Sequence, residues 1–184
     1  MPTAYIGMGG NLASVAGAPD ATLAAAADRL ESLGRVICRS SLYSTEPVGY
    51  AEQPRFVNAV VALETELAPR ALLEGLLAIE QEFGRDRAAS FANGPRTLDL
   101  DVLIFGDLEI NEPGLVIPHP RLVERAFVLV PLREVLAAQN DGSVKELLHK
   151  LSKYGRDSSD AVVPMESTHW RAGTMGGGVR HPGK

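Results

Sequence analysis

Residues 98–105 read Leu98-Asp99-Leu100-Asp101-Val102-Leu103-Ile104-Phe105, an apolar run broken twice by aspartate. In a β-strand, residues two apart point to the same face, so Asp99 and Asp101 project together while Leu100 and Val102 face the other way. The apolar residues that follow carry this strand into the core of the domain. The stretch therefore predicts the fourth strand of a sheet, with a pair of carboxylates on one of its faces.

The elements on the N-terminal side of this strand alternate in type. Strands are expected over residues 3–8, 35–43 and 56–65, and helices from Pro19 to Gly34, with Asp20 as N-cap, and from Pro69 to Gly84. The resulting order, βαββαβ, predicts an α+β fold, a ferredoxin-like sandwich in which two helices cover an antiparallel sheet. A chain of 184 residues suits one such domain.

The C-terminal side of the strand predicts a helical extension and a tail. Residues 106–120, which contain three prolines, are expected to form a loop before a helical region over residues 122–136. Ser143 and Glu146 make a capping box for a further short helix that ends at Leu151. The chain then becomes rich in Gly, Ser and Pro, so we expect an active domain over residues 1–151 and a flexible tail over 152–184.

Composition and charge narrow the class of protein. The net charge is −5, whereas proteins that bind nucleic acid through its phosphates are usually basic, so we expect no nucleic-acid partner. Cys38 is the single cysteine, which excludes an intramolecular disulfide and a cysteine-based metal site. No apolar stretch approaches the roughly 18 residues of a membrane span and no signal peptide is evident, so we expect no membrane partner and a cytoplasmic location.

The pair of aspartates predicts a site for a divalent cation. Their attachment points would lie roughly 6.6 Å apart, and at an effective dielectric near 20 the two charges would repel by about 2.5 kcal/mol. Mg²⁺ would offset this repulsion, because it binds one or two carboxylates together with phosphate oxygens. An isolated Asp-x-Asp is more often a solvent-facing pair at a strand end, but the apolar residues directly after Asp101 argue against that interpretation.

Basic side chains near the aspartates indicate phosphate chemistry. Arg85, Arg87 and Arg96 flank them in a polar segment, and guanidinium groups hold phosphates and stabilise the charge that develops during phosphoryl transfer. His119 stands between two prolines, which restrict its backbone, and it could donate to a phosphate oxygen or protonate a leaving group. Taken alone, the arginines would indicate only a solvated loop, and the histidine would more often have a structural role. No phosphate-binding Gly-rich loop is present, so ATP would bind without one.

Aromatic side chains suggest a second binding region. Phe56 and Asn58 lie two apart on the third strand and share a face, and Phe127 could close over the first ring. Two rings beside an amide suit a flat heterocycle, although either phenylalanine alone would more often belong to the core. Residues 45–54, with two prolines and a glycine, are expected to form a long binding loop.

Five motifs, in this order, resemble the 6-hydroxymethyl-7,8-dihydropterin pyrophosphokinases of folate biosynthesis over about residues 3–136. The motifs are Tyr5-Ile6-Gly7-Met8-Gly9-Gly10-Asn11-Leu12, Ser44-Thr45-Glu46-Pro47-Val48-Gly49, Gln53-Pro54-Arg55-Phe56-Val57-Asn58-Ala59, Gly94-Pro95-Arg96-Thr97-Leu98-Asp99-Leu100-Asp101 and Ile117-Pro118-His119-Pro120. The sequence departs from many relatives at Ala92, Asn93, Gly114 and Pro120.

The resemblance implies a reaction and a set of site residues. The hydroxyl of 6-hydroxymethyl-7,8-dihydropterin would attack the β-phosphorus of ATP and release AMP, with two Mg²⁺ ions held by Asp99 and Asp101. It implies the catalytic residues Arg85, Arg96, Asp99, Asp101 and His119; the nucleotide-binding residues Glu80, Arg85, Arg87, Arg96, His119 and Arg125; and the pterin-binding residues Thr45, Val48, Phe56, Asn58 and Phe127.

Two other functions compete with this one. An RNA-binding module can share the βαββαβ order, but it needs a basic surface and exposed aromatic residues on the sheet, where this chain places Asp99 and Asp101. A non-catalytic ligand-binding module would not need an aspartate pair, three arginines and a histidine around one cleft. The expected partners are ATP and the pterin, and the sequence leaves protein partners and oligomeric state open.

Overall fold

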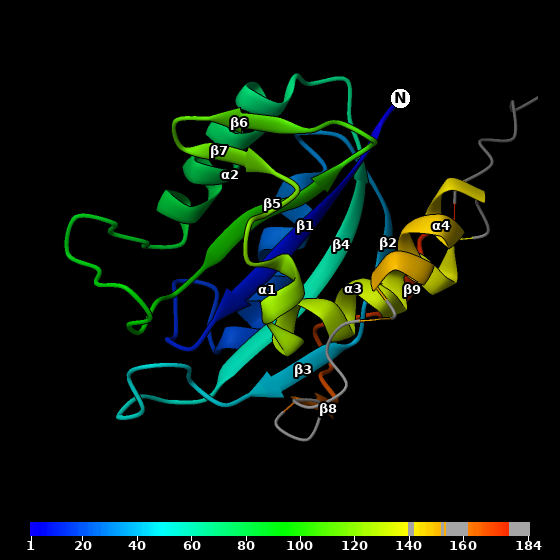
Figure 1. The fold of residues 1–184 in the computed structure, drawn as a ribbon. Helices are drawn as coiled ribbons and strands as arrows, with labels where there is room; N and C mark the ends of the chain where they lie inside the picture. Colours follow the sequence, from blue (N-terminus) through cyan, green and yellow to red (C-terminus); the bar gives the residue numbers. More distant parts are fainter. Residues whose placement is uncertain (140–141, 152, 154–161, 177–184) are drawn as a thin grey trace, which may run out of the picture.

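The computed structural model describes residues 1–139, 142–151, 153 and 162–176 (Figure 1). Within them, seven strands form one antiparallel sheet in the order β5-β1-β4-β2-β9, with β3 paired to β4 and to β8. The strands of this sheet are β1 Thr3–Gly10, β2 Arg35–Arg39, β3 Leu42–Thr45, β4 Phe56–Glu64, β5 Asp99–Phe105, β8 Val162–Met165 and β9 Gly173–Thr174.

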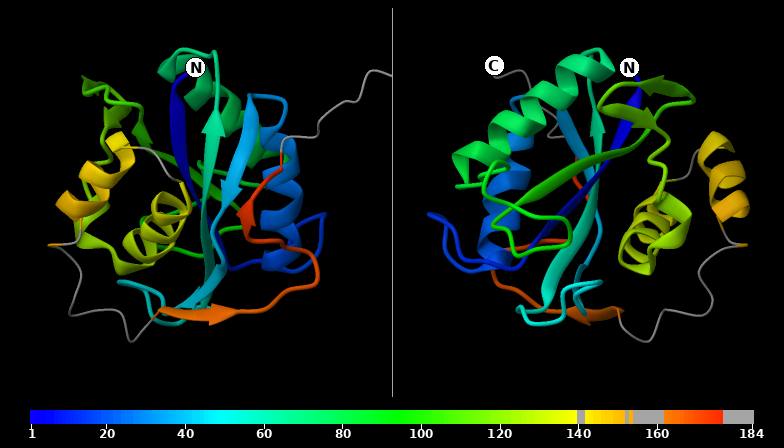
Figure 2. Two further views of the ribbon diagram at one scale, coloured as in Figure 1. Left: turned by 90° about the vertical axis from the view of Figure 1, so that its right-hand side faces the viewer. Right: turned by 60° about the vertical axis from the view of Figure 1, so that its left-hand side comes forward.

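Helices cover both faces of the sheet and make three layers (Figure 2). Helices α1 (Pro19–Leu30) and α2 (Pro69–Glu82) lie on one face. Helix α3 (Ala126–Ala138), which follows the short 3-10 helix η1 (Leu122–Glu124), lies on the other, and α4 (Gly142–Leu151) packs against α3. The predicted α+β class, the antiparallel sheet and the helical extension after β5 are confirmed.

Each face of the sheet has its own apolar core because side chains alternate along the strands. Ile6 and Leu100 contact the core beneath α1 and α2, whereas Tyr5 and Leu103 contact the core beneath α3. The helices contribute rows of buried residues at helical spacing, namely Leu23, Ala27 and Leu30 in α1 and Leu72, Leu76 and Ile79 in α2. Each fully buried leucine stabilises the fold by about 1.5–3 kcal/mol.

Both of these helices begin at a proline, but not with the predicted cap. Pro19 and Pro69 start α1 and α2, where the missing N–H of proline costs nothing. The prediction that Asp20 is the N-cap of α1 is wrong, because Ala18 occupies that position and makes no side-chain cap. Asp20 lies in the first turn and accepts a hydrogen bond from Ser167 instead. The capping box at Ser143 lies outside the described side chains.

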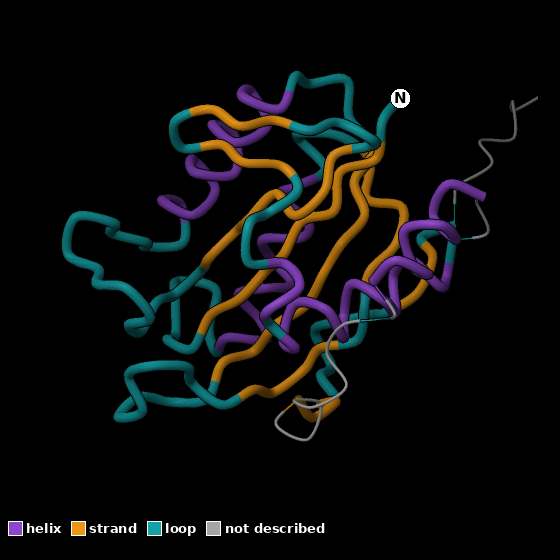
Figure 3. Tube along the Cα trace, in the orientation of Figure 1, coloured by secondary structure: helices purple, strands orange, loops and turns teal. Residues whose placement is uncertain are grey.

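Two segments carry more structure than the sequence predicts (Figure 3). The single strand expected over residues 35–43 is split into β2 and β3 at Ser40, whose hydroxyl donates to the carbonyl of Ser41 and accepts from the amide of Val60. The loop expected over residues 106–120 contains a hairpin of β6 (Ile110–Glu112) and β7 (Leu115–Ile117). Its turn is Pro113-Gly114, with Gly114 at φ 76, a pair that favours such a turn.

The expectation of a flexible tail is wrong for residues 162–176. There β8 pairs with β3, β9 pairs with β2, and Trp170 is buried against the core. The expectation rested on the Gly-, Ser- and Pro-rich composition of the tail. It failed because Val162 and Val163 pair with β3 and because the tryptophan is buried. The rest of the predicted tail, apart from Lys153, lies outside the described residues. Within the described chain, no helix is both long enough and apolar enough to cross a membrane.

Candidate active site

Asp99 and Asp101 project from β5 on the side of the sheet that faces α3, opposite to Leu100 and Val102, which join the core beneath α1 and α2. The prediction that the two carboxylates share a face is therefore confirmed. Both line a pocket between the sheet and the start of α3. The strands β1 and β4 provide the floor of this pocket, and the loop after β3 and the loop before β5 form its rim.

Glycines in β1 make the floor of the pocket hollow. Gly7 and Gly9 pair with Asp101 and Asp99 across the β1–β5 ladder, and both line the pocket. A Cβ atom at Gly9 would lie 2.6 Å from the Oδ1 atom of Asn58, and one at Gly7 would lie 3.3 Å from Leu103. The sequence does not match a nucleotide-binding fingerprint here. Instead, these glycines leave room beside the two carboxylates.

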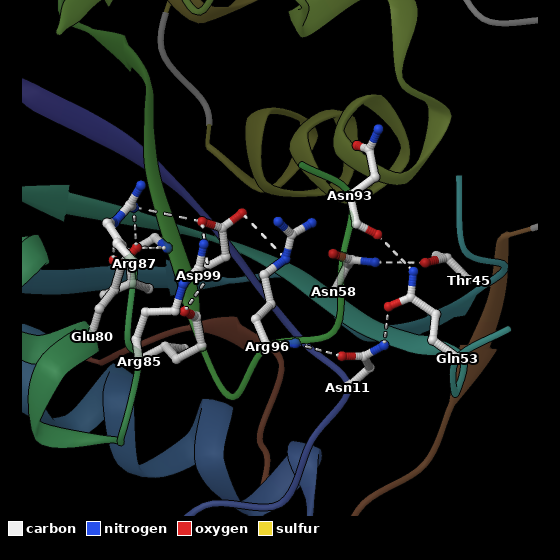
Figure 4. Close-up of polar contacts among 12 residues, drawn as sticks. Asn11, Thr45, Gln53, Asn58, Glu80, Arg85, Arg87, Asn93, Arg96 and Asp99 are labelled. Carbon is white, nitrogen blue, oxygen red and sulfur yellow. Dashed lines mark hydrogen bonds and ion pairs between the residues drawn. The ribbon is translucent and has the colours of Figure 1, made fainter. Parts of the chain in front are cut away.

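Three guanidinium groups surround Asp99 (Figure 4). The nearest nitrogens of Arg85, Arg87 and Arg96 lie 3.6, 3.8 and 3.9 Å from its carboxylate oxygens. The side chain of Arg85 is 8% exposed and that of Arg87 is 52% exposed, so the group runs from the interior to the surface. The Nε atoms of Arg85 and Arg96 are buried and have no hydrogen-bond partner among the described residues. Of the three arginines, Arg96 lines the pocket, whereas Arg85 and Arg87 lie behind Asp99.

Glu80 holds this arrangement in place from α2. It is 1% exposed, accepts the amide N–H of Leu100 at 2.8 Å, and binds the guanidinium of Arg87 through both oxygens at 2.9 Å. Burial raises the pKa of Glu80, while the Leu100 amide and Arg87 oppose that rise. Glu80 does not line the pocket. It supports β5 and Arg87 rather than facing a ligand.

Asp101 lies where a negative charge is least favourable. Burial, Asp99 and Glu80 together raise its pKa to about 7, and Arg125 and Arg87 only partly offset them. A cation between Asp99 and Asp101 would remove this penalty. Among the described residues, no group of three or more His, Cys, Asp and Glu side chains could hold a metal ion. Two carboxylates and an open pocket nevertheless fit Mg²⁺, which usually completes its shell with phosphate oxygens and water.

All five residues predicted to bind the heterocycle line the same pocket, namely Thr45, Val48, Phe56, Asn58 and Phe127. The amide of Asn58 donates to the hydroxyl of Thr45 at 2.6 Å, which fixes the amide orientation. Arginines lie against the rings: the guanidinium of Arg96 is 5.1 Å from the centre of Phe56, and that of Arg125 is 5.6 Å from the centre of Phe127. The aromatic region is thus adjacent to the arginines predicted to bind phosphate.

His119 lies beside the pocket rather than on its wall. Its backbone amide donates to the carbonyl of Leu103 at 2.8 Å, and its Nδ1 atom accepts the amide of Arg121 at 3.2 Å. The neutral ring then carries its proton on Nε2 and can donate it. Burial, followed by the charge of Arg125, lowers the pKa of His119. These observations favour a neutral hydrogen-bond donor over an imidazolium.

Sequence reasoning missed a chain of amides that links three loops (Figure 4). Asn11, at the end of β1, accepts the amide of Arg96 at 2.9 Å and donates to the side chain of Gln53 at 2.9 Å. Gln53 in turn donates to the backbone carbonyl of Asn93 at 2.6 Å. Asn93, at φ 60, lines the pocket. The Asn93-Gly94 pair, a common turn dipeptide, was the available signal for this tight bend.

Comparisons with known proteins agree with this geometry. The family profile described as 7,8-dihydro-6-hydroxymethylpterin-pyrophosphokinase (HPPK) matches residues 5–137. A relative named 2-amino-4-hydroxy-6-hydroxymethyldihydropteridine pyrophosphokinase, from Pseudomonas aeruginosa, is 47% identical over 133 residues, which are 71% of this chain and 78% of the relative. A relative of the same name from Methylorubrum extorquens is 42% identical over 159 residues, which are 84% of this chain and 97% of the relative.

Solved structures share the fold at low sequence identity. A Plasmodium falciparum HPPK-DHPS triple mutant with pteroate is similar with a TM-score of 0.60 and 16% identity. The match covers 88% of this chain but only 46% of that one, so this chain spans less than half the length of the solved protein. At this identity the likeness supports the fold alone.

Proposed function

The chain belongs to the 7,8-dihydro-6-hydroxymethylpterin-pyrophosphokinase family, and we propose that the pocket between β5 and α3 is where it carries out the reaction of that family. The enzyme transfers pyrophosphate from ATP to 6-hydroxymethyl-7,8-dihydropterin, a step of folate biosynthesis. The products are AMP and the pterin diphosphate. One observation carries the placement: two carboxylates, Asp99 and Asp101, two arginines, Arg96 and Arg125, and two aromatic rings, Phe56 and Phe127, line the same pocket.

The pterin ring binds between Phe56 and Phe127. Both rings line the pocket, and stacking against a flat heterocycle is their favoured geometry. The oriented amide of Asn58 and the backbone of Thr45 and Val48 hydrogen-bond the edge of the pterin. For the reaction to occur, the hydroxymethyl group must point toward the part of the pocket that contains Asp99.

The phosphates of ATP bind on the side of the pocket near β5. Arg96, which lines the pocket, and Arg85, which lies beside Asp99, stabilise the charge that develops on the phosphate oxygens. Arg87 adds positive charge at the surface, Arg125 adds it in the pocket lining, and the neutral His119 donates a hydrogen bond. The pterin hydroxyl forms a new bond to the β-phosphorus, and the bond from the β-phosphorus to the oxygen of AMP breaks.

Asp99 and Asp101 would hold two Mg²⁺ ions, which would neutralise phosphate charge and orient the triphosphate. Support comes from the raised pKa of Asp101 and from the space that Gly7 and Gly9 leave beside the carboxylates. Support for the ferredoxin-like arrangement comes from the strand order β5-β1-β4-β2 and from α1 and α2 on one face. A cytoplasmic location and the lack of nucleic-acid and membrane partners stay predictions.

The formation of AMP from ATP, Mg²⁺ and 6-hydroxymethyl-7,8-dihydropterin tests this proposal. The wild-type chain should form AMP only when all three are present. Asp99→Ala should lower kcat by about a hundredfold or more, the size of effect seen when a group that stabilises transition-state charge is lost. Its far-UV circular dichroism should match that of the wild type. Near-normal turnover in this variant would refute the metal assignment.

A further inference from the structure

The C-terminal segment 162–176 pairs with the outer edge of the sheet beside the pocket. Val162 pairs with Thr45 across the β3–β8 ladder, and Thr45 pairs on its other side with Phe56 in β4. Neighbouring strands lie about 4.8 Å apart, so the start of β8 is one strand away from a wall of the pocket. In Figure 1, β8 follows β3 along the same edge of the molecule.

A buried tryptophan fills the break between β2 and β3. The indole N–H of Trp170 donates to the backbone carbonyl of Ser40 at 2.7 Å, and the residue is 8% exposed. The guanidinium of Arg39 lies 5.4 Å from the centre of the indole and is paired with Asp28 at 3.0 Å. Because Ser40 is fully buried, loss of the indole would leave its carbonyl without that donor.

A second contact ties the same segment to α1. The hydroxyl of Ser167 donates to the carboxylate of Asp20 at 2.7 Å and accepts the amide of His169 at 3.1 Å. The segment is therefore held at four places: by β8, by Ser167, by Trp170 and by β9. The family profile matches residues 5–137, so residues 162–176 lie outside it, although their partners lie within it.

We propose that residues 162–176 act as an edge clamp that positions the pterin-binding ends of β3 and β4, with Trp170 as a positioning residue. This inference rests on the proposed active site. The clamp covers an otherwise bare strand edge and holds Thr45 between Val162 and Phe56. The hydroxyl of Thr45, in turn, orients the amide of Asn58. A looser clamp therefore costs affinity for the pterin, whereas the arginines and aspartates of the ATP side, on and around β5, are untouched.

Steady-state kinetics of full-length variants test the clamp. Trp170→Ala should raise the KM for the pterin about two- to tenfold, the range of one net hydrogen bond, and leave the KM for ATP within about twofold. Trp170→Phe keeps an aromatic ring but lacks the indole N–H, so it should fold well and show a smaller rise. Thr168→Ala, an exposed neighbour in the same segment, is the control and should match the wild type.

Tryptophan fluorescence gives a readout that does not depend on turnover. Trp170 is the single tryptophan of the chain, so acrylamide quenching of its lifetime reports on the clamp alone. In the wild type, quenching should be weak, and binding of the pterin should weaken it further, because coupling between two sites is reciprocal.

Distinct results would overturn the inference. An unchanged KM for the pterin in both Trp170 variants would do so, as would equal rises in both KM values, which would show that the segment does not act on the pterin region in particular. Strong quenching in the wild type would show that the segment is not docked. A wild type without turnover would instead refute the proposed function, and the quenching result would still decide whether the clamp exists.

Discussion

Asp101 is the carboxylate whose surroundings most disfavour its negative charge. Its pKa is raised from the ordinary value of 3.8 to about 7, mainly by burial and then by Asp99. Between these pH values the folded protein binds a proton that the unfolded chain does not. The free energy of unfolding of the metal-free protein should therefore fall as the pH rises from about 4 to about 7.

Asp101→Asn removes this titration and should flatten the pH dependence of stability. Urea unfolding in the presence of a chelator, at several pH values between 4 and 8, measures the effect. The difference in unfolding free energy between variant and wild type should grow in favour of the variant as the pH rises. A constant difference over this range would contradict the environment assigned to Asp101.

Gly9 is the residue whose lack of a side chain matters most for the pterin region. A Cβ atom there would lie 2.6 Å from the Oδ1 atom of Asn58, whose amide donates to Thr45, so Gly9→Ala must displace the amide that we propose binds the edge of the pterin. We expect the affinity for the pterin to fall about tenfold, the value of one or two lost hydrogen bonds. Calorimetric titration with the pterin measures it.

Gly7→Ala is the matched control for that substitution. Its Cβ atom would lie 3.3 Å from the end of the flexible side chain of Leu103, which can move by a few tenths of an ångström. Its effect on pterin affinity should be clearly smaller than that of Gly9→Ala. Equal effects of the two substitutions would show that Asn58 is not the group displaced.

The loops around the pocket depend on each other through Gln53. Its side chain contacts Asn11, the carbonyl of Asn93 and the carbonyl of Tyr50, and so it joins the loop after β3 to the loop before β5. Gln53→Ala frees both loops to sample more conformations, which binding must then restrict. We expect kcat/KM for the pterin to fall about tenfold, the value of one or two net hydrogen bonds.

Glu52→Ala is the control for Gln53→Ala. Glu52 is the exposed neighbour of Gln53, and removing its side chain should leave kcat/KM within about twofold of the wild type. Both variants should have wild-type unfolding midpoints, because loop 46–55 lies outside the two cores. If Gln53→Ala behaved like Glu52→Ala, the proposed link between the loops would be wrong.

The sequence predicted those elements that are determined by residues close together in the chain, and it missed those that depend on distant contacts. The helices α1 and α2 and the strand β5 follow from periodic apolar residues close together in the chain. The division of residues 35–43 into two strands depends instead on bonds of Ser40 to distant Val60 and Trp170, which no local pattern contains. The grouping of Arg85, Arg87 and Arg96 around Asp99 could be anticipated because all four lie within 15 residues of one another.

Across the whole molecule, the sheet lies between the pocket and the apolar core beneath α1 and α2. The face toward α1 and α2 is apolar, and the face toward α3 carries both the pocket and the second core. The net charge of −5 would repel ATP, but Arg85, Arg87 and Arg96 add positive charge around Asp99, beside the region proposed to bind the phosphates. Residues 162–176 cover the edge of the sheet through long-range strand pairing. Their composition had instead predicted a flexible tail.

Metal binding in the presence of a nucleotide tests the central claim most directly. Mn²⁺ in place of Mg²⁺ can be counted by electron paramagnetic resonance while the protein is saturated with an ATP analogue that has a methylene bridge between the α- and β-phosphorus. The wild type should bind two ions per chain with the analogue present, and Asp101→Asn should bind fewer and more weakly. Equal binding of the ions by both proteins would contradict the assignment of the two carboxylates.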